Sequence, residues 1–294
     1  VPLPIPWEAP PPIPRWRADL ALVVAAFFFG TTFLIVQDAV TAADPVPFLA
    51  VRFLIGGAVL GLLGRRRPAS PGELRDGVAG GVALLVGYVL QTIGLQYTTP
   101  STSAFITYLL VVFVPLIGFV VLRRRPHPLT LVGLVLAVVG LVLLTGGADA
   151  SFGKGEVLTL GCAVAFAAHI VIVGETAERH DAIRLTCVQV TTVGVACLVM
   201  SIVTGGLAMP ASALAAAAFT GVFATALVWA QRVVSPSRAA LILLLEPVFA
   251  ALLSALAGDP LTPGALAGGA LILAAVVVAE VVPAYLGGRE AVSH

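Results

Sequence analysis

The chain alternates between long apolar stretches and short segments that contain its charges, prolines and glycine pairs. An apolar helix needs about 20 residues, within a range of about 17 to 25, to cross the hydrocarbon core of a bilayer. Dividing the chain at the polar segments predicts ten helices, numbered here as spans 1 to 10, over residues 19–39, 46–64, 75–96, 102–122, 128–146, 155–175, 183–204, 213–230, 238–257 and 262–283. The predicted fold class is an all-α polytopic membrane protein.

The composition supports a lipid environment. Of the 294 residues, 59% are hydrophobic and 11% are charged, whereas soluble domains carry about 25% charged residues. So few polar side chains cannot cover a surface that faces water. A net charge of +1 gives no basic surface for nucleic acid. The three cysteines lie in apolar runs without C-x-x-C spacing, which favours small buried residues over a disulfide or metal site.

Both ends of the chain lie outside the predicted spans. Residues 1–18 contain seven prolines within the first fourteen positions, so we expect an extended, proline-rich tail. This tail does not have the pattern of a signal peptide, because its charge follows the prolines and the next apolar segment has full spanning length. Residues 284–294 form a second short tail.

Basic residues fall on one side when the ten spans are threaded through a membrane. With the N terminus in the cytoplasm, Lys154 lies outside and Arg52 lies within span 2. The other fourteen basic residues then lie inside: Arg15, Arg17, Arg65, Arg66, Arg67, Arg75, Arg123, Arg124, Arg125, Arg179, Arg184, Arg232, Arg238 and Arg289. Since basic loops stay in the cytoplasm, we expect a multi-pass protein of the inner (plasma) membrane with both termini cytoplasmic.

The two halves of the chain resemble each other. When Pro100-Ser101 is aligned with Pro236-Ser237, an offset of 136, the segment TTPSTSAFITYLLVVFVPLIG, from Thr98, matches VVSPSRAALILLLEPVFAALL, from Val233. DPVPFLAVRF and DAIRLTCVQV align at an offset of 137. Residues 19–146 and 155–283 are therefore predicted to be two repeats of five helices each. Because five is odd, the second repeat is inverted in the membrane, which is an architecture typical of secondary transporters.

These residues also resemble a known family. RAALILLLEPVFAALLSALAG followed by PLTPGALAGGALILAAVVVAE is similar to the second repeat of EamA-type transporters of the drug/metabolite transporter superfamily. FFFGTTF in span 1, RF in span 2 and GLQYTTPSTSAFIT before span 4 match the first repeat. The resemblance covers nearly the whole chain beyond the tail. It implies ten helices, inverted repeats and export of small metabolites or drugs, often linked to protons.

Span 8 departs from the family pattern. GYVLQTIGLQYTTP precedes the Pro-Ser turn of the first repeat, and FATALVWAQRVVSP precedes that of the second without an LQT equivalent. We expect span 8 to be about one helical turn shorter than span 3. Either the bilayer adapts to the shorter helix or transport is compromised, and the sequence leaves both alternatives open.

Glu246 stands in the middle of the apolar run LILLLEPVFAALL of span 9. An acidic side chain at a helix centre costs about 3 kcal/mol to insert, so we expect it to face the protein interior. Two roles are open: a carboxyl that binds substrate or couples transport to protons, and a structural carboxyl beside a helix break at Pro247. Pro115 in span 4 provides an approximate counterpart of that break, whereas the carboxyl has none.

Two other ionisable residues lie within spans. Arg52 either extends to the outer surface and pairs with Asp38 or Asp44, or contacts an anionic group of the substrate, such as an amino-acid carboxylate. His169 in span 6 is either a proton relay or a neutral packing residue. No metal-ligand spacing surrounds His169.

The remaining candidates are polar and aromatic. Tyr88 and Gln91 share a face of span 3, Thr107 and Tyr108 lie in span 4, and Trp229 ends span 8. A cavity lined by such groups suits a partly apolar solute, although interhelical hydrogen bonds and an interfacial position for Trp229 are the alternatives. The predicted central cavity comprises Glu246, Gln91, Tyr88, Thr107, His169, Trp229 and Arg52.

Enzyme motifs are absent from the sequence: it contains no G-x-S-x-G and no G-x-x-x-x-G-K-[ST]. We therefore expect no catalytic residues, cofactor or metal. The predicted function is a secondary exporter of small organic metabolites or drugs, amino-acid-like or amphipathic, that works by alternating access. Its partners are a small-molecule substrate, the lipid bilayer and protons, and it acts as a monomer or homodimer. The alternatives are a membrane enzyme or lipid-handling protein, and a transport-inactive paralogue.

Overall fold

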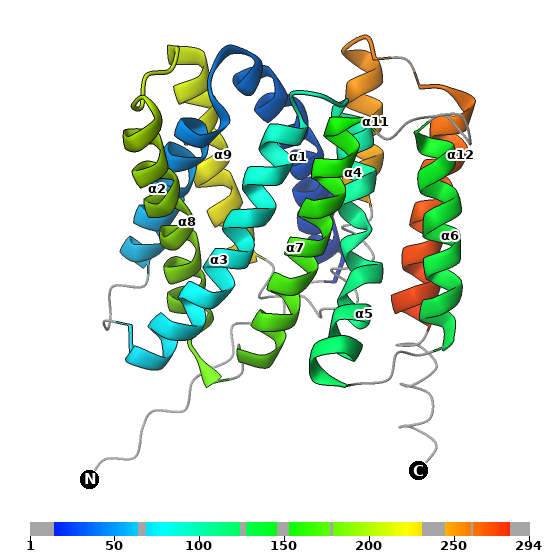
Figure 1. Ribbon diagram of the computed structural model, residues 1–294, viewed down its shortest axis with the longest axis horizontal. Helices are drawn as coiled ribbons and strands as arrows, with labels where there is room; N and C mark the ends of the chain where they lie inside the picture. Colours follow the sequence, from blue (N-terminus) through cyan, green and yellow to red (C-terminus); the bar gives the residue numbers. More distant parts are fainter. Residues whose placement is uncertain are drawn as a thin grey trace.

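A computed structural model describes residues 15–63, 69–123, 128–145, 153–176, 179–230, 245–259 and 261–282. The proline-rich tail up to residue 14 and the final tail lie outside these ranges. The regular elements of the described ranges are helical throughout and contain no strand. They stand roughly parallel to one another as a bundle (Figure 1).

Each predicted span corresponds to a helix or to two consecutive helices. The helices are α1 Arg15–Ala42, α2 Pro45–Leu63, α3 Pro71–Gly94, α4 Pro100–Tyr108, α5 Leu110–Leu122, α6 Pro128–Leu144, α7 Lys154–Thr176, α8 Ala182–Thr204, α9 Ala211–Ala230, α11 Leu245–Leu256, α12 Pro263–Val276 and the π-helix η3 Val277–Val281. Together α4 and α5 form span 4, and α12 with η3 forms span 10. Within the described ranges, six segments are long and apolar enough to cross a membrane, and the remaining apolar helices are shorter. The predicted fold class is confirmed.

Threonine–proline pairs set the starts of the helices α4 and α12. Thr99 precedes Pro100 at the start of α4, and its side chain accepts a hydrogen bond from the Thr102 backbone N–H. Thr262 does the same before Pro263, accepting from the Ala265 N–H. Proline suits the first helical position because its missing N–H would have no intrahelical partner there, and threonine satisfies another free N–H.

The packing of the helices follows the internal repeat. Each span of the first half has an equivalent five spans later in the second half. The contacts between α2 and α8 and between α6 and α12 each join a span to its own equivalent. The α3–α7 contact maps onto α1–α9, and α2–α9 maps onto α3–α8. The halves are therefore packed against each other around an approximate two-fold axis. At the right-hand edge of Figure 1, α6 and α12 form one of the self-equivalent pairs.

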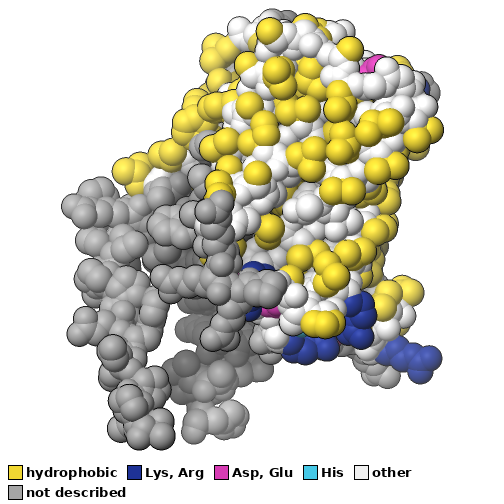
Figure 2. All heavy atoms as spheres, turned by 90° about the vertical axis from the view of Figure 1, so that its left-hand side faces the viewer, with side chains coloured by type: hydrophobic (Ala, Val, Ile, Leu, Met, Phe, Trp, Pro, Cys, Tyr) yellow, Lys and Arg dark blue, Asp and Glu magenta, His cyan; other side chains and the backbone are white. Residues whose placement is uncertain are grey.

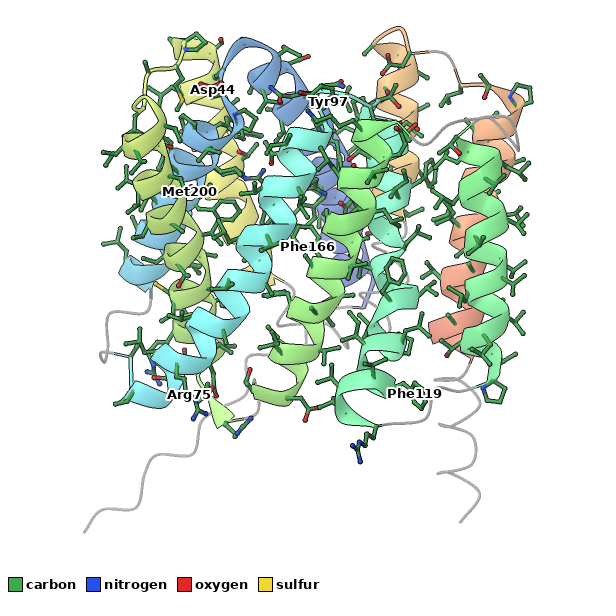
Figure 3. All side chains as sticks on the ribbon, viewed as in Figure 1. Asp44, Arg75, Tyr97, Phe119, Phe166 and Met200 are labelled. Carbon is green, nitrogen blue, oxygen red and sulfur yellow. The ribbon has the colours of Figure 1, made fainter. Side chains whose placement is uncertain are left out.

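Equivalent helices run in opposite directions, as the odd number of spans requires. From the lower end of the bundle α1 rises to the upper end, where Asp44 follows it (Figures 1 and 3). Its equivalent, α7, begins at the upper end with Lys154, whose Nζ lies 4.0 Å from the centre of the Tyr97 ring. At the lower end α7 leads to His180, which bonds Asp76 of α3.

On the face of the bundle that Figure 2 shows, the described side chains are apolar over most of the height and basic at the lower end. Val120, Val203 and Leu256 are each more than 75% exposed. Such exposure is expected where the surrounding solvent is lipid. Arg75 lies at the lower end (Figure 3).

A polar cluster joins the lower ends of α3 and α8. Glu73, which forms a capping box with Ser70 at the start of α3, accepts hydrogen bonds from the Arg184 side chain at 2.9 and 3.0 Å. His180 Nε2 lies 2.8 Å from Asp76 Oδ2, and Arg75 donates to the other Asp76 oxygen. These contacts connect the first half to the second at this end.

Helix α9 is described from Ala211 to Ala230, where this described range ends. Its end relative to that of α3 lies outside the described residues, so the expected shortening of span 8 stays a prediction.

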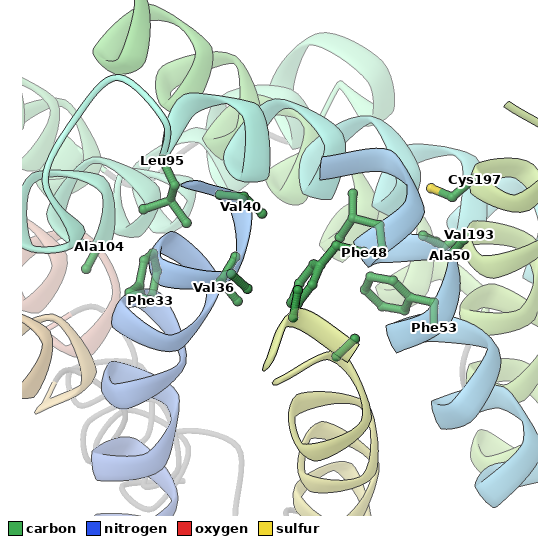
Figure 4. Close-up of a cluster of buried hydrophobic side chains, with 14 of the residues drawn as sticks. Phe33, Val36, Val40, Phe48, Ala50, Phe53, Leu95, Ala104, Val193 and Cys197 are labelled. Carbon is green, nitrogen blue, oxygen red and sulfur yellow. The ribbon is translucent and has the colours of Figure 1, made fainter. Parts of the chain in front are cut away.

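The upper half of the bundle encloses an apolar core. Phe33, Val36 and Val40 of α1 pack with Phe48 and other side chains of α2, α3 and α8 (Figure 4). Phe33, Val36 and Leu95 also line the cavity described below. The core therefore forms the upper boundary of the candidate site.

Glycines permit close contacts between helices, because they let two backbones approach each other. A Cβ atom built on Gly140 of α6 would lie 2.8 Å from the Gly268 carbonyl oxygen of α12. A Cβ on Gly30 of α1 would lie 2.8 Å from the Glu246 carbonyl oxygen of α11. These glycines therefore serve close helix packing.

We expect Gly140→Ala to lower the stability of the protein. The added methyl group would push α6 away from α12, and such overpacking costs about 1–3 kcal/mol. The matched control is Gly118→Ala in α5, where a Cβ meets nothing within 4 Å, so alanine should stabilise that helix by about 0.5–1 kcal/mol. The measurement is the midpoint of thermal unfolding in detergent, and equal midpoints for both variants would contradict the packing argument.

Candidate functional site

A cavity of about 440 Å³ lies between helices of both halves. This volume is within the range of small-molecule sites, about 300–1,000 Å³. Phe166 of α7 is on its wall and lies at mid-height in the bundle (Figure 3). The lining residues are Phe29, Thr32, Phe33, Val36, Arg52, Tyr88, Gln91, Leu95, Thr107, Tyr108, Leu110, Val111, Val114, Phe166, Ile170, Glu246 and Val276. The wall is mostly apolar and carries a small set of polar groups.

Glu246 lies on the cavity wall and contacts the opposite half of the protein. Its Oε2 atom accepts a hydrogen bond of 3.0 Å from the Tyr108 hydroxyl of α4. Its backbone carbonyl faces Gly30 of α1, which leaves room for the close approach of α11. The carboxyl therefore links the second half to the first at the cavity.

The interruption of span 4 lies next to this contact. Helix α4 ends at Tyr108, and Leu109 separates it from α5. Pro115 lies inside α5, six residues further along, so the turn seen here precedes the expected break at Pro115. Pro247 lies in the first turn of α11, and the chain before α11 is outside the described residues, as is any break there.

Arg52 of α2 also lines the cavity and is only 5% exposed. Its guanidinium carbon lies 5.5 Å from the ring centre of Phe53 and 5.3 Å from that of Tyr88. Among the described residues, no ion pair with Asp38 or Asp44 exists. The expectation that Arg52 pairs with an acidic residue at the outer surface is therefore wrong, because burial among aromatic rings keeps the guanidinium inside.

The polar residues of span 3 and span 4 meet as neighbours on the wall. Gln91 donates a hydrogen bond of 3.1 Å from Nε2 to Thr107 Oγ1. Tyr88 packs edge-on against Phe53 and Phe166, with ring centres 4.6 and 5.0 Å away. The interhelical bond and the cavity lining, which the sequence left as alternatives, coexist here.

Two predicted cavity residues are not placed on the wall. His169 lies apart from the lining residues, and its Nε2 atom is 3.2 Å from Gln189 Oε1 of α8. This contact fits the packing role rather than a direct contact with a solute. Trp229 belongs to α9, and its side chain lies outside the described residues.

Sequence reasoning did not select several residues of the wall. Tyr108 was noted beside Thr107, but its partner Glu246 lies 138 positions away, so no local pattern reveals the contact. Phe29, Phe33 and Phe166 belong to apolar spans in which one aromatic residue resembles another. Only the packing of the helices distinguishes those that border the cavity.

Above the cavity, hydrogen bonds join the upper ends of α1, α3 and α7. Gln37 donates from Nε2 to the carbonyl oxygens of Leu95 and Thr98 at 3.1 and 2.8 Å. Thr98 donates to Glu156 Oε1 at 2.6 Å. Leu95 also lines the cavity, so these bonds hold together the wall on the upper side.

The described residues contain no group of three or more His, Cys, Asp or Glu side chains able to hold a metal ion. The site instead combines one carboxyl, one guanidinium, an amide, hydroxyl groups and aromatic rings. Such a set can hold a small organic solute by burial and a few polar contacts.

The sequence profile of the EamA-like transporter family matches residues 16–146 and again residues 153–280. The chain belongs to the EamA-like transporter family. It is thus a multi-pass membrane transporter of the drug/metabolite transporter superfamily, built from two repeated halves. This family consists of transporters rather than enzymes, which decides against the enzyme alternative.

Relatives agree with this assignment. The chain is 33% identical over 274 residues to a protein of Archaeoglobus fulgidus named "Uncharacterized transporter", covering 90% of this chain and 86% of the relative. It is 26% identical over 232 residues to "Uncharacterized transporter YvbV" of Bacillus subtilis, covering 74% of each chain. A solved structure titled "Crystal structure of protein" has a TM-score of 0.63 and 21% identity, covering 90% of this chain and 98% of the other. The last comparison supports the fold alone.

We expect a cysteine at position 107 to react with a small water-soluble thiol reagent. In a background with Cys162, Cys187 and Cys197 replaced by alanine, Thr107→Cys places its thiol on the cavity wall. The matched control, Thr159→Cys, replaces a threonine that is 0% exposed, bonds the Gly155 carbonyl and is not on the wall. Because access controls thiol modification, position 107 should react about tenfold faster. Equal rates in a mass-spectrometric time course would contradict the assignment of the cavity.

Proposed function

We propose that this EamA-family protein is a secondary exporter of small organic solutes and that the cavity is its transport site. The observation that carries the proposal is the composition of the wall, which comes from both repeats: α1 to α5 of the first and α7, α11 and α12 of the second. In inverted-repeat carriers the substrate site lies near mid-membrane at the repeat interface. Tilting one repeat against the other then exposes the same site to either side of the membrane.

Glu246 is the proposed proton-coupling group. It faces the cavity from α11 and accepts a hydrogen bond from Tyr108 of the other repeat. Protonating the carboxyl removes the charge that makes it the acceptor of a charge-assisted bond. A proton on Glu246 therefore weakens a contact between the repeats, which is how proton binding would favour one orientation of the bundle.

Polar contacts at the two ends fit the requirement for two gates. The upper contact runs from Thr98 to Glu156, and the lower contacts are Glu73–Arg184 and Asp76–His180. Each joins the first repeat to the second. In an alternating-access cycle, one set separates while the other holds.

The orientation follows from the basic residues. The lower end carries Arg75, Arg179 and Arg184, and the upper end carries Lys154 next to Tyr97. By the positive-inside rule, we assign the lower end and both termini to the cytoplasm of the inner (plasma) membrane. Export is then movement from the lower to the upper end.

The proposed role of Glu246 predicts a specific defect in Glu246→Gln. A tenfold proton gradient is worth about 1.4 kcal/mol per proton, so a carrier that exchanges one proton for one neutral solute accumulates that solute about tenfold at zero membrane potential. The variant keeps the size of the side chain, but its amide cannot bind and release a proton. We expect it to exchange labelled solute across proteoliposome membranes but to show no accumulation driven by a pH gradient. The probes are a panel of labelled amino acids, cationic drugs and 3-phenylpropionate.

The matched control is Asp38→Asn, which neutralises an exposed carboxyl of α1 away from the cavity. It should retain proton-driven accumulation. Undiminished accumulation by Glu246→Gln would eliminate the coupling role of this carboxyl. Folded wild-type protein that moves none of the probes would support the transport-inactive alternative suggested by the missing LQT equivalent in span 8.

A further inference from the structure

The Arg52 guanidinium is a cation on the cavity wall that lacks a hydrogen-bonding partner within the described part of the chain. It is 5% exposed, and its Nε N–H is buried without an acceptor. No ion pair reaches it from the described residues. The other charged group of the wall, Glu246, is engaged by Tyr108.

The aromatic neighbours of Arg52 stabilise its buried charge only in part. The faces of Phe53 and Tyr88 lie within 5.5 Å of the guanidinium carbon and attract a cation. However, a guanidinium has five N–H donors, and ring faces do not provide the oxygen acceptors that match its planar geometry. Burying a charge without such acceptors costs free energy. A buried guanidinium is therefore stable where another group supplies the acceptors.

Tight backbone packing prevents α2 from moving Arg52 to a different partner. The Arg52 carbonyl oxygen lies against Gly221 of α9, where a Cβ would overlap it. Two residues further along α2, the Leu54 backbone nitrogen faces Gly194 of α8, where a Cβ would lie 2.8 Å from that nitrogen. The glycines of α8 and α9 thus fix the position from which the guanidinium enters the cavity.

From this geometry we infer that Arg52 binds the acidic group of the transported solute, and that the solutes are monocarboxylates with an aromatic or branched apolar body. The inference rests on the proposed function, since it takes the cavity as the transport site. A carboxylate matches the guanidinium through two parallel N–H···O bonds. The missing partner of Arg52 is then supplied by the solute.

The rest of the wall fits the remainder of such a solute. Phe29, Phe33 and Phe166, together with Val111 and Val114, provide apolar surface for a hydrocarbon body. Within the described residues that line the cavity, Arg52 is the single Lys or Arg side chain. A second negative charge on the solute would therefore lack a cation, and it would share the cavity with the Glu246 carboxyl.

Binding to the purified full-length protein in detergent tests this inference with three related probes. We expect 3-phenylpropionate to bind at least about tenfold more tightly than its neutral amide, 3-phenylpropionamide, because a charge-assisted hydrogen bond is stronger than a neutral one. The dianion benzylmalonate should also bind at least about tenfold more weakly than 3-phenylpropionate. The measurement is isothermal titration calorimetry at neutral pH.

Variants of Arg52 identify the group responsible. Arg52→Gln should lose the preference for the acid over the amide, and Arg52→Lys should keep part of it, since lysine retains the charge without the planar fork. The matched control is Arg75→Gln, which removes an arginine whose side chain is 77% exposed at the lower end of α3. The control should bind 3-phenylpropionate with unchanged affinity.

Equal affinities of the wild-type protein for the acid and the amide would overturn the inference, and this comparison requires no variant to fold. Retention of the acid preference in folded Arg52→Gln would overturn it as well. The test is separate from that of transport, because it measures binding without flux. Arg52-dependent binding of the acid without movement across proteoliposomes would support the anion site and contradict the transport function. Flux of amides and amines without flux of acids would support the transport function and contradict the anion site.

Discussion

The absence of water around most of the bundle is the constraint on which the structure depends. Every backbone N–H and C=O group in the hydrocarbon core has to be satisfied internally, and the apolar segments of the described residues achieve this as helices. The same constraint makes the outside apolar and turns the few polar groups of the spans inward. Glu246, Gln91 and Thr107 therefore face other helices and the cavity, where they find hydrogen-bond partners or room for a solute.

In lipid the hydrophobic effect no longer drives helices together, so close packing and polar contacts hold the bundle. Gly140 and Gly268 allow α6 and α12 to approach backbone to backbone, and Gly30 does the same for α1 and α11. The second of these contacts has a functional consequence. It brings Glu246 of the second repeat within reach of Tyr108 of the first, at the wall of the shared cavity.

The two charged side chains on the apolar wall of the cavity differ in their chemistry. Glu246 already has a hydrogen-bond donor in Tyr108, whereas the Arg52 guanidinium is stacked on rings. A carboxyl that gains or loses a proton and a guanidinium that never loses its charge suit different tasks. The first suits the coupling of transport to protons, and the second suits recognition of an anionic solute. Both tasks belong to one central site in the proposed cycle.

The sequence by itself determined that lipid surrounds the protein, where the spans lie and that the two halves repeat. The apolar stretches located all ten spans, because the spanning length is set by the bilayer, and the recurrence of the Pro-Ser segment defined the two halves. It also pointed to Glu246, Gln91, Tyr88, Thr107 and Arg52, since polar residues are conspicuous in apolar segments. Only the tertiary structure decided which of these share a cavity. It placed His169 against Gln189 instead, and it brought Tyr108 to Glu246 across 138 positions. Helix periodicity gives the faces of a single helix, whereas the neighbours of each face depend on how glycines let helices from two repeats pack.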